Sequence, residues 1–214
     1  MNITNYNPNQ GLMIIAPTNS QKYTEKLDSY SQILTNIYSS NSASKFCIDS
    51  CWESKNIYYA NSSEGYVKKI SYDGTEISSL SLINPSMVSI IQYSNAMSTS
   101  ITYPPQDDQG VWIVDSSTNK AIKTDNELNI LYEANTSNVV SISASIDGGC
   151  YVVEELNGIG SLIKISGSGV VQSSKNYTQF SPSITKFKDI VEDGNGILWL
   201  CANDKIYKLR FYIL

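Results

Sequence analysis

The stretch GVWIVDSSTNKAIKTDNELNILYEAN, residues 110–135, decides the fold of this chain. It contains three short runs, VWIVD, KAIKT and NILYEA, separated by Ser, Thr, Asn and Asp. Short apolar runs bounded by such residues are typical of β-strands joined by tight turns. The stretch therefore predicts adjoining antiparallel strands, and further copies of it would indicate a repeat architecture.

Four further copies of this pattern occur along the chain. Each has an apolar run, a polar turn and a second run that contains a lysine. The copies are GLMIIAPTNSQKYTEKLDSYSQILTNI from Gly11, NIYYANSSEGYVKKISYDGTEISSLSL from Asn56, GCYVVEELNGIGSLIKISGSGVVQSSK from Gly149 and ILWLCANDKIYKLRFYIL from Ile197.

Two marker residues occur in each of the five copies, always in the same order. The first run carries a large side chain at its second apolar position, and the second run carries a lysine. The markers are Met13, Tyr58, Trp112, Tyr151 and Trp199, followed in the same order by Lys26, Lys69, Lys123, Lys164 and Lys208. A strand-like segment precedes each copy, and a fourth usually follows the lysine run. A tandem unit of about 43 residues with four short strands is the signature of a β-propeller blade.

The sequence therefore predicts an all-β chain, a β-propeller of about five blades with mostly four antiparallel strands each. We expect one domain over residues 1–214, with approximate blades 1–41, 42–95, 96–137, 138–182 and 183–214. The segment INPSMVSIIQYSNAMS from Ile83 is expected in a connection or outer hairpin, before a first strand in STSITYPP from Ser98. Only LRFYIL follows Lys208, so the last blade is expected to be incomplete. Either the ring closes on three strands, or an open edge pairs with another chain.

Two segments resemble the blades of known propellers. KDIVEDGNGILWLCANDKIYKL from Lys188 and GVWIVDSSTNKAIKTD from Gly110 resemble NHL-repeat and two-component-regulator blades. The resemblance extends over nearly the whole chain and is strongest in blades two to five. It implies the propeller fold but no particular activity, because propellers include enzymes, lectins, scaffolds and virion components.

Composition argues against several partners. The chain has 15 Lys and Arg against 20 Asp and Glu, a net charge of −5, and no long basic stretch that could follow a nucleic-acid backbone. No segment approaches the roughly 18 apolar residues of a membrane helix, and no Sec-type signal begins the chain. We therefore expect no nucleic-acid partner and no membrane insertion, with a cytoplasmic or virion-associated location.

The chain has no histidine, which excludes the Ser-His-Asp and Cys-His nucleophilic schemes and imidazole metal sites. Streptogramin-inactivating lyases resemble this chain in their blades, but they depend on a histidine that is absent here. Calcium-dependent lactonases of propeller fold use carboxylates and Asn around the channel, so a metal-dependent lactonase stays open as an alternative.

The four cysteines lie at positions that predict packing and not chemistry. Cys150 and Cys201 occupy slots that hold aliphatic residues in the other copies, and only Cys47 and Cys51 are close enough in sequence to suggest a shared site. A four-thiolate zinc site needs two such close pairs. We therefore expect free thiols, no metal and no cofactor.

The marker aromatics are expected to pack between blades, although a ring of sugar-stacking platforms is an alternative. The marker lysines are expected at solvent or extended across the blade surface. Trp52, in DSCWESKN, has no equivalent in the other copies and is a candidate exposed contact residue.

Carboxylates recur in the turns expected between the first and second strands of each blade. Successive blades present equivalent turns on one face, so these residues predict an acidic rim that could bind a cation or a basic partner, or simply stabilise turns. Together with Trp52, the candidate binding residues are Asp49, Glu53, Asp107, Asp108, Asp147, Glu192 and Asp193.

These observations favour a non-catalytic interaction or structural module, such as a subunit of a larger assembly like a virion or surface appendage. We expect a protein partner or self-association. A carbohydrate-binding propeller with a glycan ligand and a metal-dependent lactonase-like hydrolase are the alternatives.

Overall fold

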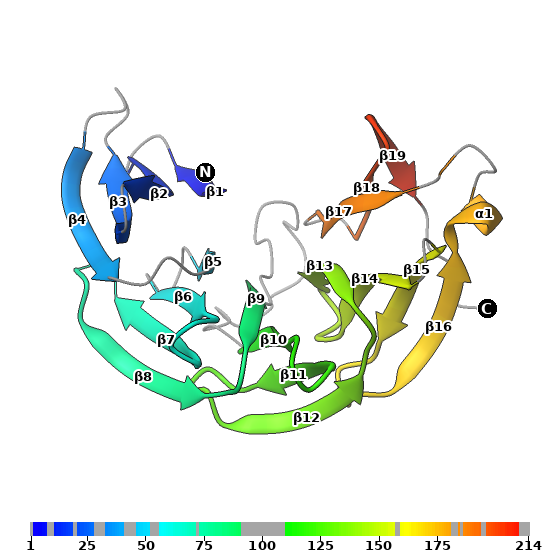
Figure 1. Cartoon of the computed structure of the whole chain (residues 1–214), viewed down its shortest axis with the longest axis horizontal. Helices are drawn as coiled ribbons and strands as arrows, with labels where there is room; N and C mark the ends of the chain where they lie inside the picture. Colours follow the sequence, from blue (N-terminus) through cyan, green and yellow to red (C-terminus); the bar gives the residue numbers. More distant parts are fainter. Residues whose placement is uncertain are drawn as a thin grey trace, which may run out of the picture.

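The fold is a series of five antiparallel β-sheets that follow one another along an arc (Figure 1). The computed structural model describes residues 2–7, 11–18, 21–27, 33–40, 46–51, 56–71, 73–90, 110–156, 159–180, 184, 186–193 and 196–209, and within residues 2–51 it describes the side chains of Cys47 and Asp49 only. Strands and turns make up nearly all of these residues, with one helical turn, α1 (Tyr177–Phe180). The prediction of an all-β propeller is confirmed.

Each sheet forms one blade, numbered I to V in chain order, and the strands of every blade pair in sequence order. Blade I contains β1 (Asn2–Asn7), β2 (Gly11–Thr18), β3 (Gln21–Leu27) and β4 (Ile33–Ser40). Blade II contains β5 (Phe46–Cys51), β6 (Asn56–Asn61), β7 (Tyr66–Ser71) and β8 (Glu76–Ser81). Blade III contains β9 (Pro85–Ile90), β10 (Val111–Asp115), β11 (Lys120–Thr124) and β12 (Ile130–Asn135). Blade IV contains β13 (Val139–Ala144), β14 (Cys150–Leu156), β15 (Ile159–Ile165) and β16 (Val171–Asn176), and blade V contains β17 (Phe187–Glu192), β18 (Leu198–Ala202) and β19 (Lys205–Leu209).

The hairpin between β10 and β11 shows why these residues form strands and turns. The Asp115 carboxylate accepts hydrogen bonds from the amides of Ser117 and Thr118, at 3.0 and 3.3 Å. Asn119 then adopts a φ of 52°, a left-handed conformation that Asn tolerates better than most residues. The polar turn that the sequence marks is thus held by its own aspartate.

The third blade differs from expectation in its innermost strand. The segment from Ile83 was expected in a connection, but Pro85–Ile90 forms β9 and pairs with β10 along its whole length. Proline lacks an amide hydrogen, and a strand tolerates it at its first position. The second blade therefore ends before Pro85, and the strand expected from Ser98 lies outside the described residues.

The hydrophobic core lies between blades, in layers that join the face of one blade to the back of the next. We call the side of each blade that contacts the following blade its forward face. Blades III and IV meet through a buried cluster whose main members are Trp112, Val114, Ala121, Cys150, Val152 and Ile165. Equivalent clusters join blades II to III and IV to V. Burying one such aliphatic side chain contributes roughly 1.5–3 kcal/mol, so these layers dominate the stability of the arc.

The marker aromatics belong to these layers, as expected. Tyr58, Trp112 and Tyr151 are buried, each on the forward face of its blade, while Trp199 of blade V is half-buried. Met13 is one of the residues whose side chains are not described. Because the three buried rings are covered by the next blade, they are unavailable as sugar-stacking platforms.

The innermost strands are joined from blade to blade by a repeated hydrogen bond. On the first strand of each of blades II to IV, a polar residue lies opposite the marker aromatic. Its side chain accepts a backbone amide hydrogen from the first strand of the next blade. The donor is the residue that follows the equivalent position there. The amide of Ile90 donates to Asp49 at 2.9 Å, that of Ala144 to Ser89 at 2.8 Å, and that of Glu192 to Ser143 at 2.9 Å. These bonds fix the height of each blade against its neighbour and satisfy amides on strands whose inner edge has no further strand.

The five blades do not enclose a full ring. The innermost strands lie side by side in the order β1, β5, β9, β13 and β17, and blades I and V are the two ends of the arc (Figure 1). Blade V has three strands in the residues that the structure describes, in agreement with the expected incomplete blade. Within the same residues, no helix is long and apolar enough to span a membrane.

Replacement of a marker aromatic tests the interblade layer. Trp112 is fully buried, whereas Tyr132 on β12 is exposed. Trp112→Ala is expected to lower the free energy of unfolding by roughly 3–5 kcal/mol, because it leaves a cavity between blades III and IV. Tyr132→Ala serves as the exposed control and is expected to cost far less. Denaturant midpoints measure both, and equal losses would contradict the layer assignment. Trp52, the exposed candidate from the sequence, lies outside the described residues.

Candidate functional site

Five hairpin loops at one rim of the arc share the same backbone turn. In each, the first residue donates its amide to the carbonyl of the fifth, and the fourth donates back to the first. The fourth residue has positive φ in all five, which favours glycine. The loops run 71–75, 125–129, 145–149, 166–170 and 193–197, and the fourth residues are Gly74, Leu128, Gly148, Gly169 and Gly196. We call this set of loops the hairpin rim.

Leu128 is the exception to the glycine pattern. Its φ is 67°, yet its side chain is buried in the cluster between blades II and III, beside Tyr58 and Ile113. The left-handed conformation costs an ordinary residue about 1–2 kcal/mol. Burial of the leucine side chain offsets this cost, since Leu128 closes the top of the interblade layer.

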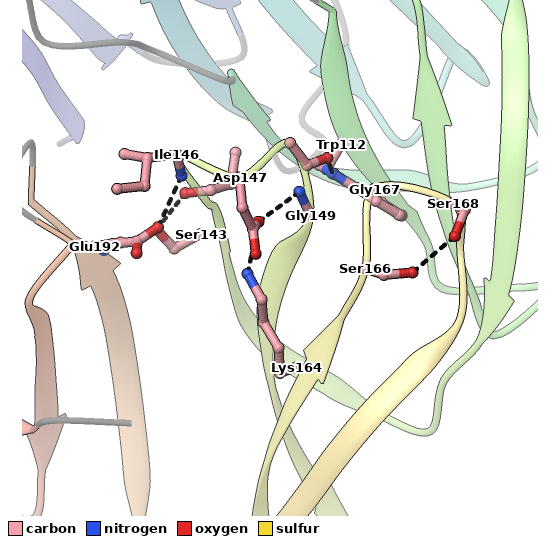
Figure 2. Close-up of polar contacts among 12 residues, drawn as sticks. Trp112, Ser143, Ile146, Asp147, Gly149, Lys164, Ser166, Gly167, Ser168 and Glu192 are labelled. Carbon is pink, nitrogen blue, oxygen red and sulfur yellow. Dashed lines mark hydrogen bonds and ion pairs between the residues drawn. The ribbon is translucent and has the colours of Figure 1, made fainter. Parts of the chain in front are cut away.

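The centre of the hairpin rim is the contact between Asp147 and Lys164 in blade IV (Figure 2). Asp147 Oδ1 accepts hydrogen bonds from Lys164 Nζ at 2.8 Å and from the Gly149 amide at 2.9 Å. The Lys164 side chain is fully buried, and its ammonium lies 4.2 Å from the centre of the Tyr151 ring. The aspartate thus holds the loop and neutralises a lysine that rises from inside the blade.

This environment shifts two pKa values. Burial alone would raise the pKa of the Asp147 carboxyl, but the hydrogen bonds from Lys164 and Gly149 and the charge of Lys164 outweigh it, so the pKa lies below its ordinary value. Burial, followed by the negative charges of Glu192 and Asp147, raises the pKa of Tyr151 to about 12. Near neutral pH the aspartate is therefore ionised and the tyrosine is protonated.

Blade III contacts the same rim through its marker aromatic, Trp112, and its marker lysine, Lys123, which together form its marker pair. Trp112 Nε1 donates to the Gly148 carbonyl at 3.2 Å, and Lys123 Nζ donates to the Gly167 carbonyl at 3.0 Å (Figure 2 shows Trp112 and Gly167). Burial lowers the pKa of the Lys123 ammonium, and the charge of Asp147 partly opposes this shift. One marker pair thus holds both hairpin loops of the following blade.

Blade II repeats this arrangement on blade III. Tyr58 Oη and Lys69 Nζ both donate to the Asn126 carbonyl, at 3.1 and 2.7 Å. Lys69 Nζ also lies 3.5 Å from a Glu127 carboxylate oxygen and 5.9 Å from the centre of the Tyr58 ring. The marker aromatic and the marker lysine are directly opposite each other in the strand pairing, as Trp112 and Lys123 are.

Of the two positions expected for the marker lysines, the solvent-exposed one is wrong for Lys69 and Lys164, which are buried. Each lysine shares a strand face with apolar residues, so its four methylene groups lie in the interblade layer and only the ammonium reaches the rim. The sequence contains a partial signal, because the lysine follows the marker residue by 9, 11 or 13 residues, an odd separation that allows the two to lie opposite each other across a hairpin. A residue so placed belongs to the same buried face.

The structure distributes the candidate acidic residues over two kinds of position. Asp147 and Asp193 lie in hairpin loops, as expected, whereas Asp49 lies within β5 and Glu192 ends β17. The expectation that the latter two lie in loops is therefore wrong: both face the neighbouring blade and accept its amides. Ile146 N donates to Glu192 at 3.0 Å, as Ile90 N does to Asp49. The remaining candidates are outside the described residues, namely Trp52, Glu53, Asp107 and Asp108.

Asp193 illustrates how completely a rim carboxylate is engaged by its own blade. Its Oδ1 accepts the Ile197 amide at 3.0 Å, and its Oδ2 accepts Trp199 Nε1 at 2.9 Å. Blade V therefore anchors its marker aromatic on its own loop, while Trp112 is anchored on the next blade. Within the described ranges, no three acidic or cysteine side chains lie close enough to hold a metal ion together.

The described cysteines are free thiols with packing roles. Cys150 is buried in the layer between blades III and IV, and burial raises the pKa of its thiol. The Cys47 sulfur accepts the Val88 amide at 3.4 Å, so it joins β5 to β9. Cys201 is half-buried on β18. These positions agree with the expected core slots.

Removal of the Asp147 carboxylate tests the pairing with Lys164. Asp147→Ala leaves the buried ammonium without its acceptor, which typically costs about 1–3 kcal/mol of unfolding free energy, towards the lower end because Asp147 is half exposed. The folded-state pKa of Asp147 is lowered, so its contribution is present at neutral pH. It is lost as the pH falls from about 4 through the folded-state value. Urea midpoints across this pH range measure the difference from the wild type.

The same experiment has a built-in rescue and a control. Combining Asp147→Ala with Lys164→Met removes both charges and keeps an apolar chain of similar length, so most of the lost stability should return. Asp204→Ala removes the partner of exposed Lys188 and should leave the midpoint unchanged. A loss in Asp147→Ala that persists at acidic pH, or that Lys164→Met does not relieve, would disprove the pairing.

No protein-family model matches the chain, and no curated protein matches it. Solved structures do match. Hydrazine synthase from Kuenenia stuttgartiensis is similar with a TM-score of 0.69 and 14% identity, over 94% of this chain and 54% of that chain. A nidogen/laminin complex matches with a TM-score of 0.60 and 12% identity, over 92% and 73% of the two chains. A streptogramin B lyase matches with a TM-score of 0.55 and 13% identity, over 91% and 77%.

These likenesses concern the fold. At 11–14% identity, the matched chains share the arrangement of blades with this protein and not its side chains. The chain spans about half the length of the hydrazine synthase chain that it matches. The neighbours, the tandem sheets and the repeated marker pairs together identify the chain as a β-propeller whose blades resemble the NHL type.

Proposed function

We propose that this chain is a non-catalytic β-propeller module that works by contact with another protein. In this proposal it acts as a subunit of a larger assembly, such as a virion or a surface appendage. The hairpin rim and the two ends of the arc are the surfaces that it offers. The main support for the proposal is that the carboxylates of the hairpin rim form hydrogen bonds and an ion pair with groups of the propeller itself.

The carboxylates at the hairpin rim are structural groups. Asp147 accepts a lysine and an amide, Asp193 accepts an amide and an indole, and Glu192 accepts an amide of the neighbouring blade. A general acid must carry its proton at the working pH, but the lowered pKa of Asp147 keeps that carboxyl ionised. Asp147 is therefore unsuited to act as a general acid near neutral pH, and the hydrogen bonds of all three residues hold loops and strands of the propeller.

The same carboxylates give the hairpin rim a charge that a partner can recognise. The side chain of Asp147 is about half exposed, at 49%, although its oxygen also binds Lys164. The chain as a whole carries a net charge of −5. A basic protein surface complements such a rim and is drawn to it by electrostatic attraction. We include Trp52, Glu53, Asp107 and Asp108 in this proposed contact surface.

The alternatives have less support. The aromatic platforms that a glycan site would need are covered by the next blade at Tyr58, Trp112 and Tyr151. Propellers of similar shape include a lyase and a hydrazine synthase as well as a member of a nidogen/laminin complex, so the fold is compatible with either class.

A hydrolase assay distinguishes contact from catalysis. The purified chain is incubated with lactone, ester and phosphoester substrates, with calcium, magnesium, manganese or zinc added in turn. We expect hydrolysis at the rate of the buffer, because the rim carboxylates are engaged in structural bonds. Divalent-dependent turnover that disappears in Glu192→Gln or Asp49→Asn would overturn the proposal in favour of the lactonase-like alternative. Asp204→Asn, in an exposed ion pair, is the control for a general effect of charge.

A further inference from the structure

Among the described residues, no blade packs against the forward face of blade V, whereas the next blade covers the forward faces of blades II to IV. Each of those faces is built from the same positions: an aliphatic residue and a lysine on the third strand, the marker aromatic on the second, and a polar acceptor on the first. In blade V these positions hold Ile206, Lys208, Trp199 and Val191. Their exposure and bonding can be compared one by one with the covered blades.

The aliphatic position shows the largest difference. Val67, Ala121 and Leu162 occupy it in blades II, III and IV, and all three have no exposed surface. The equivalent Ile206 in blade V is 74% exposed. A large aliphatic side chain at a position that is otherwise fully buried indicates a surface made to be covered.

The innermost strand shows the same difference. Asp49, Ser89 and Ser143 each accept an amide of the following blade. The equivalent residue in blade V is Val191, which is 54% exposed and has no side-chain acceptor. Blade V therefore offers an apolar contact where the other blades offer a hydrogen bond, so its partner is held differently at the inner edge.

Lys208 completes the face. Lys69, Lys123 and Lys164 each bind an oxygen of a hairpin loop. Lys208 is exposed and lies 5.5 Å from the centre of the Trp199 ring, with no hydrogen bond to an oxygen among the described residues. Its ammonium is placed to donate a hydrogen bond to a loop carbonyl or carboxylate oxygen of the partner that covers blade V.

We propose that the forward face of blade V binds the back of blade I in a second copy of this chain. Three layers within the arc join the forward face of one blade to the back of the next, and blades I and II are in contact through β1 and β5. The two sides left over are the forward face of blade V and the back of blade I, which lie at opposite ends of the arc (Figure 1). Two copies can cover these sides by repeating the forward-to-back contact that joins blades II to V.

The composition of the face favours this pairing over a symmetric one. If two blade V faces met each other, the interface would contain two Lys208 ammonium groups, and like charges in one interface disfavour association. Blade I, in contrast, is a four-stranded sheet in the same order as those that cover blades II and III. The contact is therefore heterologous, joining different faces, and it closes into a ring or extends as a filament. This inference rests on the proposed role as a contact module and names its partner.

Two exposed isoleucines give a matched test. Ile206 is 74% exposed on the forward face of blade V, and Ile83 is 70% exposed in the connection between blades II and III. Light scattering coupled to size exclusion gives the mass of the 214-residue chain over a wide range of concentration. We expect the wild type and Ile83→Glu to rise above the mass of one chain as concentration increases. Ile206→Glu should keep the mass of one chain throughout, with an unchanged denaturation midpoint.

Alkylation of Cys201 provides a second readout on the same face, because it lies on β18 beside Ile206. Its labelling, followed by peptide mass spectrometry, should slow with concentration in the wild type but not in Ile206→Glu.

Three results would overturn the inference. These are a wild-type chain that keeps the mass of one chain at every concentration, an assembly that Ile206→Glu does not weaken, and a single chain whose denaturation midpoint falls in Ile206→Glu. The last result would mean that blade I of the same chain covers the face. None of these outcomes depends on the hydrolase assay, so the failure of this inference and the failure of the proposed function can be told apart.

Discussion

The structure depends on the contact between the forward face of one blade and the back of the next. A single four-stranded sheet has two faces and cannot bury both, so each blade is stable only when its neighbours cover it. The marker aromatic packs in this layer with a cluster of aliphatic side chains, and its directly opposite lysine extends through the same layer. Where the pair is fully covered, as at Trp112 and Lys123, its two polar tips bind both loops of the following blade. Packing and loop geometry are therefore determined together.

The lysines explain the chemistry of the hairpin rim. An ammonium that emerges from a buried face needs an oxygen, and the rim supplies loop carbonyls at Asn126 and Gly167 and a carboxylate at Asp147. The cost of bringing the lysine out of bulk water is offset because these bonds are short and, at Asp147, the acceptor carries the opposite charge. Acidic and carbonyl groups at the rim thus serve the interblade layer first, and any partner binds to a surface that the fold has already organised.

Two departures from the repeat lie at the faces of blades. In the layer between blades II and III, Leu128 replaces the usual glycine and fills space that its neighbours leave, although its backbone is strained. In blade V, Val191 replaces the polar acceptor, and Trp199 binds its own loop. Each substitution follows from what lies on the other side of the face, which is a core cluster in one case and no described blade in the other.

The sequence by itself determined the repeat, the all-β class and the buried aromatics, because alternation and turn residues are local properties of a strand. It also placed Asp147 and Asp193 in loops. Only the tertiary structure decided which strand-like segment pairs with β10, because Pro85–Ile90 and the segment from Ser98 have similar local patterns. It likewise decided that Lys69 and Lys164 are buried and that Asp49 and Glu192 bind the neighbouring blade. The spacing within a hairpin can place a lysine on the same face as its marker aromatic, but whether that face is covered depends on a neighbouring blade that is distant in sequence.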